Sequence, residues 1–278
     1  MSFNLVLNSS NVVGSNCNTY AYNFISGNFV VKDDYEICVS QVTIPYSWYN
    51  ITTTQTVSII WPGSSSSPYT WTIVPGFYTV SDLNLALQLF CSNKGLYLVS
   101  GASNVYFLSL YTNTALYKNQ LIAQKIPTSA GSYTAPSTWP GYPAVETTPQ
   151  IVLSSSSSQL NSILGFATGT FPSVNTANIS VLSTLVPVGS TVNSLLMTCN
   201  LVNNAVAMPS NILCGIPIDG TFGSNLNYSP SYQQWVKITP GRYSSMVVQF
   251  TDQSYTPLSA LDSNILIVLN IRKGYSEK

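Results

Sequence analysis

The stretch Tyr35–Tyr46, YEICVSQVTIPY, decides the fold class of this chain. Its β-branched and aromatic residues favour an extended strand, and its apolar side chains recur at about every second position, as on a half-buried strand. The charged turn Lys32–Asp34 precedes it, and the aromatic segment Asn18–Phe24 before that turn alternates in the same way. The first part of the chain therefore predicts antiparallel strands joined by turns.

The same period of two continues along the sequence, and the segments that carry it are rich in Val, Ile, Thr and Tyr. Turn residues such as Gly, Pro, Asn and Ser separate them. We predict further strands at Phe29–Lys32, Thr56–Trp61, Tyr69–Val74, Gly95–Val99, Asn104–Leu110, Ile151–Leu153, Ser194–Val202, Ile212–Ile218, Trp235–Ile238, Tyr243–Thr251 and Ile265–Ile271.

Two short segments carry helical spacing instead. In Thr79–Cys91, Thr79 or Ser81 can cap a helix, and Asp82 lies in the first turn near the positive end of the helix dipole. A second helix of one or two turns is predicted over Ser156–Leu164, with Gly165 placed to end it. Neither helix is long enough to be stable alone, so both should pack on a sheet.

Residues 125–149 are rich in Pro, Gly, Ser and Thr and contain Tyr133, Trp139 and Tyr142. A stretch of this length without secondary structure is uncommon, so we expect an irregular insertion loop that projects from the fold. Residues 1–16 should form an N-terminal arm ahead of the first confident strand. The sequence shows no repeat and no linker, and we expect one domain over residues 1–278.

Charge is nearly absent from this chain. Lys and Arg together number 9, Asp and Glu number 9, and histidine is missing, and no charged residue occurs in the whole of Thr147–Ile218. Acid–base, metal and phosphate chemistry depends largely on those side chains. We therefore expect no enzyme: no catalytic residues, no cofactor-binding residues and no metal site. A surface with 6% charged residues, against about 25% in typical domains, has little charge to resist association.

Several other classes of function are disfavoured. Asp33, Asp34 and Glu36 offer oxygen ligands for Ca²⁺, but a solvated turn between strands is the stronger interpretation. The sequence contains no run of Lys and Arg of the kind that binds nucleic acid, and no apolar run of about 18 residues that would span a membrane. The first residues lack the pattern of a secretory signal, and the five cysteines, an odd number without C-x-x-C spacing, are expected to be reduced and mostly buried.

Three blocks of sequence resemble a known family when they are taken together and in order. They are ICVSQVTIPYSWYNI at Ile37–Ile51, VPGFYTVSDLNLAL at Val74–Leu87 with LNSILGF following at Leu160–Phe166, and the C-terminal block Val247–Lys273. The chain resembles the single jelly-roll penton (minor capsid) proteins of icosahedral double-stranded DNA viruses. That family includes proteins of virophages, polinton-like viruses and nucleocytoplasmic large DNA viruses.

The resemblance implies an all-β fold, a single antiparallel eight-stranded jelly roll with two short helices. It also implies a structural capsid protein that forms a homopentamer at the fivefold vertices. Its partners would be itself, adjacent trimers of the major capsid protein and other minor capsid proteins, without specific nucleic acid. The location would be the virion, after assembly in the host cytoplasm. The alternative is a carbohydrate- or receptor-binding β-sandwich, such as a lectin-like or fibre-head domain, for which the 18 tyrosines supply aromatic side chains.

Overall fold

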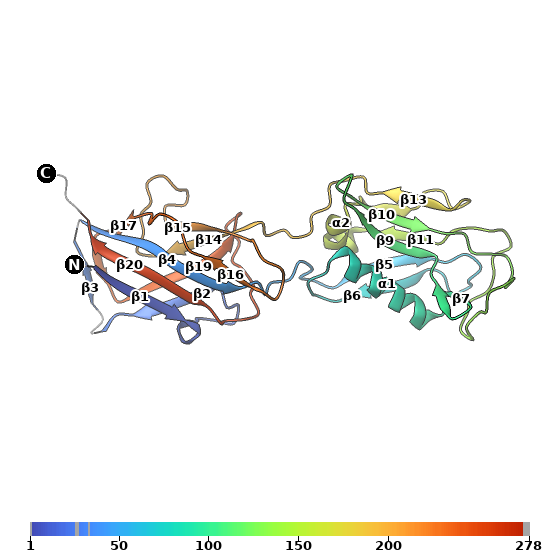
Figure 1. Cartoon of the computed structure of the whole chain (residues 1–278), viewed down its shortest axis with the longest axis horizontal. Helices are drawn as coiled ribbons and strands as arrows, with labels where there is room; N and C mark the ends of the chain where they lie inside the picture. Colours follow the sequence, from blue (N-terminus) through green and yellow to red (C-terminus); the bar gives the residue numbers. More distant parts are fainter. Residues whose placement is uncertain (1, 26–27, 33, 275–278) are drawn as a thin grey trace. The chain divides into compact units, whose positions relative to one another are not determined.

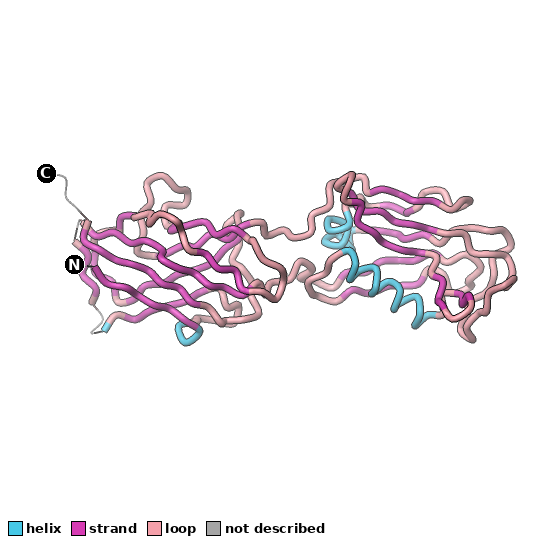
Figure 2. The backbone as a smooth tube through the Cα atoms, viewed as in Figure 1, coloured by secondary structure: helices cyan, strands magenta, loops and turns pink. Residues whose placement is uncertain are grey.

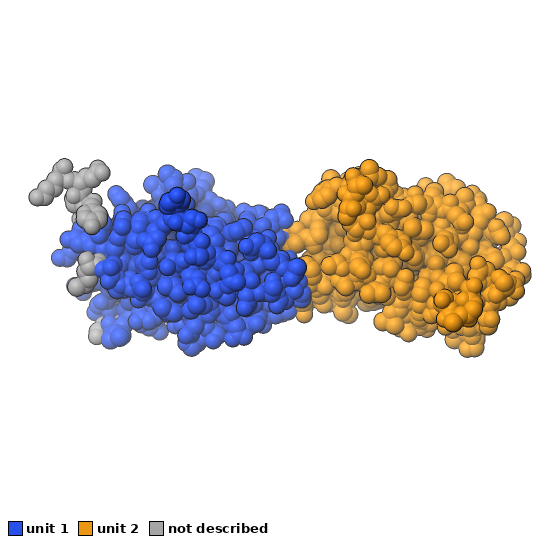
Figure 3. Space-filling model, viewed as in Figure 1, with its two compact units in different colours: residues 1–48, 192–278 blue, residues 49–191 orange. Residues whose placement is uncertain are grey.

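The computed structural model describes residues 2–25, 28–32 and 34–274 of the chain. These residues divide into two compact units (Figure 3). Unit 1 contains residues 1–48 and 192–278, and unit 2 contains residues 49–191. Where the sequence predicts one domain over residues 1–278, the structure thus has a second unit inserted into the first, and the insertion carries its own buried core.

Unit 1 is built from two antiparallel sheets. Within the described residues, one sheet has the order β1 (Ser2–Asn8), β20 (Leu266–Lys273), β4 (Tyr35–Pro45) and β16 (Asn225–Tyr228), with β17 (Val236–Lys237) also paired to β4. The other has the order β15 (Ile212–Pro217), β14 (Ser194–Cys199), β19 (Ser245–Asp252) and β2 (Thr19–Asn23). A short ribbon joins β3 (Phe29–Val31) to β18 (Gly241–Tyr243), and a 3-10 turn follows β1 at Ser9–Asn11.

The order of these strands confirms the predicted jelly roll for unit 1. When the β3–β18 ribbon and the strands of unit 2 are left out, β1, β2, β4 and β14 follow one another along the chain and fall in alternate sheets. Strands β15 and β16 also lie in different sheets. Strands β19 and β20 then occupy the middle of the two sheets. Apart from the two-residue β17, each sheet has four strands, which is the jelly-roll arrangement of two Greek keys. Figure 1 shows β1, β20 and β4 side by side in unit 1.

Alternation of side chains makes the core of unit 1. Ile267, Leu269 and Ile271 of β20 are fully buried, while the residues between them are only half-buried. On the other sheet the same pattern buries Met246, Val248 and Phe250 of β19. Each such side chain contributes about 1.5–3 kcal/mol relative to its exposed state, so the two inner faces hold the sheets together.

Strand β4 changes the phase of its alternation in the middle. Val268 of β20 pairs with Gln41 and Leu269 pairs with Val39, so Ser40 has no opposite residue and forms a β-bulge. Ile37 and Val39 before the bulge, and Val42 and Ile44 after it, are all buried. The extra residue therefore lets the predicted strand at Tyr35–Tyr46 keep its apolar side chains on the core face along its whole length.

Part of the expected N-terminal arm, residues 1–16, is a strand of the jelly roll. Residues Ser2–Asn8 form β1, which pairs with β20 from Ser2 opposite Arg272 to Asn8 opposite Leu266. Leu5 and Leu7 of β1 are buried. Pairing with the last strand gives the backbone its hydrogen bonds and buries the apolar face, and an arm free to reach a neighbour would lose both.

Unit 2 is also antiparallel and β-rich. One sheet has the order β12 (Gly169–Phe171), β11 (Gln150–Leu153), β5 (Gln55–Ile60) and β6 (Tyr69–Ile73). A second has the order β13 (Ile179–Leu182), β10 (Lys118–Ala123) and β9 (Leu108–Asn113). A small third sheet pairs β7 (Leu98–Ser100) with β8 (Ser103–Val105). The two larger sheets share one buried cluster, to which Ile59, Trp71, Leu110, Leu121 and Ile151 belong. The predicted strand Asn104–Leu110 is two strands, β8 and β9.

Both predicted helices are present in unit 2. Helix α1 (Val80–Lys94) begins at Thr79, whose side chain accepts from the Asp82 backbone N–H while the Asp82 carboxylate accepts from the Thr79 backbone N–H, and it ends at left-handed Gly95. Helix α2 (Ser158–Leu164) follows a 3-10 turn at Ser155–Ser157 and ends at left-handed Gly165. Figure 2 shows α1 lying along the unit 2 strands, and the Leu110 backbone N–H donates to Asn84 Oδ1 of α1 at 2.8 Å.

The expected projecting loop at residues 125–149 packs against the fold. Ile126 is fully buried and pairs with Thr147 across the base of the segment, while Thr134 pairs with Val99. Tyr133, Trp139 and Tyr142 contact the unit 2 core. The composition predicts irregular structure correctly, but the aromatic rings bury apolar area and hold the segment on the sheets.

Candidate functional site

The acidic residues considered for Ca²⁺ are used in ion pairs. Glu36 Oε2 lies 2.9 Å from Arg272 Nη2, and Asp34 Oδ2 lies 3.2 Å from Lys273 Nζ. Asp33 is outside the described residues. Across residues 2–25, 28–32 and 34–274, no group of three or more His, Cys, Asp or Glu side chains is placed to hold a metal ion.

The fold gathers charges that are scattered in the sequence. Lys237 and Arg272 flank Glu36 from the neighbouring strands, and Lys273 lies opposite Tyr35. Arg242 lies on β18, opposite Val30, and Lys32 directly follows β3 in the chain. Asp252, in contrast, pairs with Leu195 at the other end of the strands. The sequence has no basic run, yet the pairing of β4, β17 and β20 brings three cations of the described residues, Lys237, Arg272 and Lys273, next to Asp34 and Glu36.

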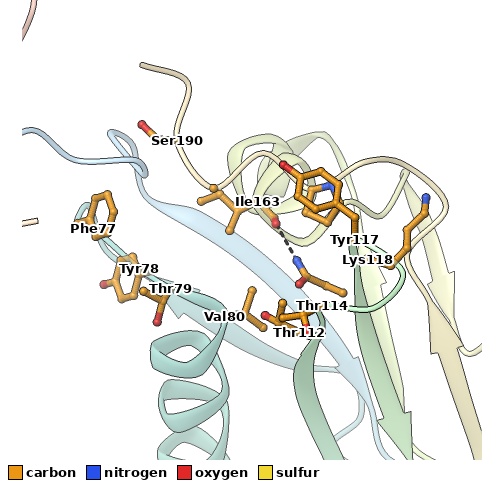
Figure 4. Close-up of a pocket in the computed structure, with 13 residues that line it drawn as sticks. Phe77, Tyr78, Thr79, Val80, Thr112, Thr114, Tyr117, Lys118, Ile163 and Ser190 are labelled. Carbon is orange, nitrogen blue, oxygen red and sulfur yellow. Dashed lines mark hydrogen bonds between the residues drawn. The ribbon is translucent and has the colours of Figure 1, made fainter. Parts of the chain in front are cut away.

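Unit 2 contains a pocket of about 420 Å³. Its walls come from the start of α1, from the β9–β10 hairpin, from Ile163 of α2 and from Pro187 and Gly189 of the following loop. Figure 4 shows Phe77 and Tyr78 on one side of the pocket and Tyr117 and Lys118 on the other. A volume of 300–1,000 Å³ and a mostly apolar lining are usual for small-molecule sites.

Two polar residues that line this pocket, Lys118 and Asn119, already have hydrogen-bond partners. Lys118 Nζ donates to the backbone oxygens of Thr184 and Leu185 at 3.3 and 3.0 Å. Asn119 is buried, and its Nδ2 donates to the backbone oxygens of Ile163 and Leu164 at 3.0 and 3.3 Å. These bonds connect the hairpin to α2 and to the loop that forms the opposite wall. The pocket therefore presents mainly apolar and aromatic surface.

Tyr117 has an unusual conformation at the rim of the pocket. Its φ of 51° lies in the left-handed region, and its side chain is 73% exposed. A bulky residue with positive φ is a backbone outlier that stores strain and is found often at functional sites. The sequence gives no sign of this, because nothing in the segment Asn113–Lys118 marks residue 117 as the left-handed position.

The cysteines do not form a reactive site in the described structure. Cys38, Cys91, Cys199 and Cys214 are buried free thiols, as predicted, and Cys17 is half-buried. Burial raises the pKa of Cys91 and Cys214 to about 12 and that of Cys199 to about 11, and it also raises the pKa of Cys38. Such thiols stay protonated at neutral pH and behave as small apolar side chains.

Large apolar side chains are exposed on both units. On unit 1 the most exposed are Ile25, Val206 and Met208, at 86%, 96% and 88%. On α1 of unit 2, Leu85 and Leu89 are 61% and 62% exposed and lie one turn apart on the outer face. Leu85 and Leu89 are neighbours on the helix surface, and adjacent exposed apolar side chains are typical of surfaces that become buried in an assembly.

The fold thus defines an all-β protein in which a jelly roll carries an inserted β-rich unit. None of the helices in the described part of the chain is long and apolar enough to cross a membrane. No known protein-family profile matches the sequence, and no curated protein sequence matches it.

Solved structures with a similar arrangement include two from virophages. One is the crystal structure of the mavirus penton protein. Its sequence is 10% identical to this chain, the match covers 98% of each of the two chains, and the TM-score is 0.44. Another is a chain of the Sputnik virophage structure from electron cryomicroscopy, 10% identical over 98% of this chain and 96% of that chain, with a TM-score of 0.41.

Proposed function

We propose that this chain is a structural capsid protein that forms the homopentameric penton at the fivefold vertices of an icosahedral double-stranded DNA virus shell. Its neighbours there would be trimers of the major capsid protein and other minor capsid proteins. The protein would act in the virion, following assembly in the host cytoplasm, without catalysis or a cofactor.

The observation that carries this proposal is a jelly roll with an almost uncharged exterior that exposes large apolar side chains. Unit 1 exposes Ile25, Val206, Met208 and Leu261, and the whole chain has only 6% charged residues. A freely diffusing protein gains solubility from charge, and this surface lacks it. Burial against neighbouring subunits would remove those apolar side chains from water.

The sequence blocks that resemble penton proteins occupy the structural centre of the two units. Ile37–Ile51 contains most of β4, and Val247–Lys273 runs from β19 through β20, so these two blocks supply neighbouring central strands of the jelly roll. Val74–Leu87 supplies the turn and first half of α1. The resemblance therefore rests on segments that determine the fold rather than on loops.

A closed fivefold ring requires two different surface patches, because each subunit meets one neighbour on each side through a heterologous contact. Unit 1 supplies unlike sides: one sheet ends at β1 and β16, and the other ends at β15 and β2. Unlike edges of this kind are compatible with the heterologous contacts of a closed ring.

Electron cryomicroscopy of purified particles tests the proposal directly. We expect density at the fivefold axes into which both units can be placed, with five copies per vertex. Density at those axes that cannot hold unit 1, or unit 1 fitting another capsid position, would contradict the assignment. A monomer in dilute solution is compatible with it, because ring formation depends on concentration and on the surrounding shell.

The alternative, a carbohydrate- or receptor-binding β-sandwich, requires an aromatic recognition surface. The unit 2 pocket has aromatic walls from Phe77, Tyr78 and Tyr117. A sugar also needs several hydrogen-bonding groups that are free to meet its hydroxyls, and Lys118 and Asn119 are already engaged with backbone oxygens. This second function is therefore supported less well than the structural one.

A further inference from the structure

We propose that the pocket of unit 2 binds an uncharged small molecule whose body is an apolar ring system, with the Tyr117 ring forming one wall of the site. Every residue of the pocket lies within unit 2, and small-molecule binding there goes beyond the proposed role in capsid assembly. The argument rests on the construction of the walls, on their neutrality and on the strained rim residue.

The pocket is a built site rather than a gap between loops. Asn119, buried on β10, donates to two carbonyls at the end of α2, and Lys118 donates to two carbonyls of the following loop. On the other wall, Tyr78 is fixed at both ends, since its backbone N–H donates to Asn50 Oδ1 at 2.8 Å and its hydroxyl donates to the Val74 backbone oxygen at 3.1 Å. These bonds fix the residues of each wall in place within unit 2.

The chemistry of the lining selects for an uncharged ligand. Lys118 is the charged side chain among the lining residues, and its ammonium is directed to two carbonyl oxygens away from the other pocket residues (Figure 4). Val80, Ile163 and Pro187 supply aliphatic surface, and Phe77, Tyr78 and Tyr117 supply ring faces. A charged ligand would lose hydration without gaining a counter-charge, whereas an apolar ring would bury area against both kinds of surface.

The conformation of Tyr117 is the second, independent observation. Glycine would fit φ of 51° without strain, yet the position carries a tyrosine whose ring is largely exposed at the mouth of the pocket. An exposed ring gives little stability to the fold to offset its backbone strain. The strain is accounted for if the ring gains its contacts from a bound molecule.

The experiment uses the full chain and the neutral fluorescent probe N-phenyl-1-naphthylamine, whose emission rises in apolar sites. We expect saturable binding of one probe per chain. Thr112→Trp, which places an indole in the pocket from an exposed strand position, and Tyr117→Gly, which removes the rim wall, should each weaken binding at least about tenfold. Tyr255→Gly is the matched control, because Tyr255 also has positive φ, 62°, but lies in unit 1.

Stability separates a binding role for Tyr117 from a structural one. Tyr117→Gly relieves a left-handed tyrosine, so the melting temperature should stay the same or rise while probe affinity falls. A lower melting temperature with unchanged affinity would overturn the proposal, as would wild-type affinity in Thr112→Trp or no saturable binding to the natural chain. Displacement of the probe by millimolar methyl glycosides, with no displacement by uncharged aromatic compounds, would replace the proposed ligand class by a saccharide and so refute it.

Discussion

The guanidinium of Arg272 lies between the carboxylate of Glu36 and the ring of Trp235. Nη2 and Nε are 2.9 and 3.0 Å from Glu36 Oε2, and the guanidinium carbon is 3.8 Å from the centre of the indole ring. Glu36 and Arg272 are also directly opposite each other on β4 and β20. One side chain thus links two central strands and the segment leading into β17.

Arg272→Met should lower the free energy of unfolding by about 1–2 kcal/mol, because it removes both the ion pair and the cation–π contact. Urea denaturation monitored by circular dichroism measures this change. Lys273→Met is the control: its amine is also paired, 3.2 Å from Asp34, but that side chain is 59% exposed, and a loss below about 0.5 kcal/mol is expected. Equal losses in the two variants would contradict the role assigned to Arg272.

Deleting Ser40 should prevent unit 1 from folding. The deletion removes the bulge, so either the residues before it or those after it must turn their buried side chains, such as Ile37 or Val42, toward solvent. We expect loss of the cooperative urea transition of unit 1. Ser40→Thr, which keeps the residue count, should retain that transition, and a deletion variant with normal unfolding would show that the register is set elsewhere.

Residues 125–149 should be required for the stability of unit 2. The Trp139 ring lies 6.0 Å from Trp61 and 5.4 Å from Tyr142, centre to centre, and its Nε1 is buried without a hydrogen-bond partner among the described residues. Trp139→Ala should cost about 3 kcal/mol in the free energy of unfolding. Trp139→Phe keeps an aromatic ring and removes the unpaired N–H, so it should cost much less. If both changes are neutral in thermal unfolding, the segment is a dispensable surface loop after all.

Stability should be flat from about pH 5 to 8 and fall in alkali. No histidine is present to titrate in that range. Burial raises the pKa of Cys91 from 9.0 in the unfolded chain to about 12, so its contribution is complete below pH 9 and is lost as the pH rises toward 12. Urea midpoints measured from pH 5 to 11 test this, and Cys91→Ala should reduce the alkaline decline. A urea midpoint that increases as the pH is raised above 9 would contradict this prediction.

Local patterns in the sequence predict local structure well. The strand at Tyr35–Tyr46 and the two helices are found because alternation, capping residues and terminal glycines act within a few neighbouring residues. Strands β1 and β10 are missed because their register depends on distant partners, β20 for the first and β9 and β13 for the second. The same limit applies to the division into units, since no change of composition marks Tyr49 or Thr191.

The candidate sites could be predicted only in part. The scarcity of charge is visible in the sequence, but the cluster of Glu36, Lys237 and Arg272 is not, because these residues meet only when β4, β17 and β20 pair. The pocket depends on the hairpin, on α2 and on a loop, and the Tyr117 strain depends on the turn geometry. The packing of Tyr133, Trp139 and Tyr142 on the unit 2 core could not be placed from their presence in the sequence.

The pairing of β1 with β20 has a consequence for how this chain is made. A ribosome produces β1, β2 and β4, then the whole of unit 2, and only afterwards the strands that complete the first sheet. At 5–20 residues per second, β4 waits roughly 10–45 s for β20 to emerge. During that interval unit 2 can fold independently, while β1, β2 and β4 lack their partner strands and expose apolar side chains. Nascent chains of this protein should therefore depend on chaperones most strongly after β4 has been made and before β20 emerges.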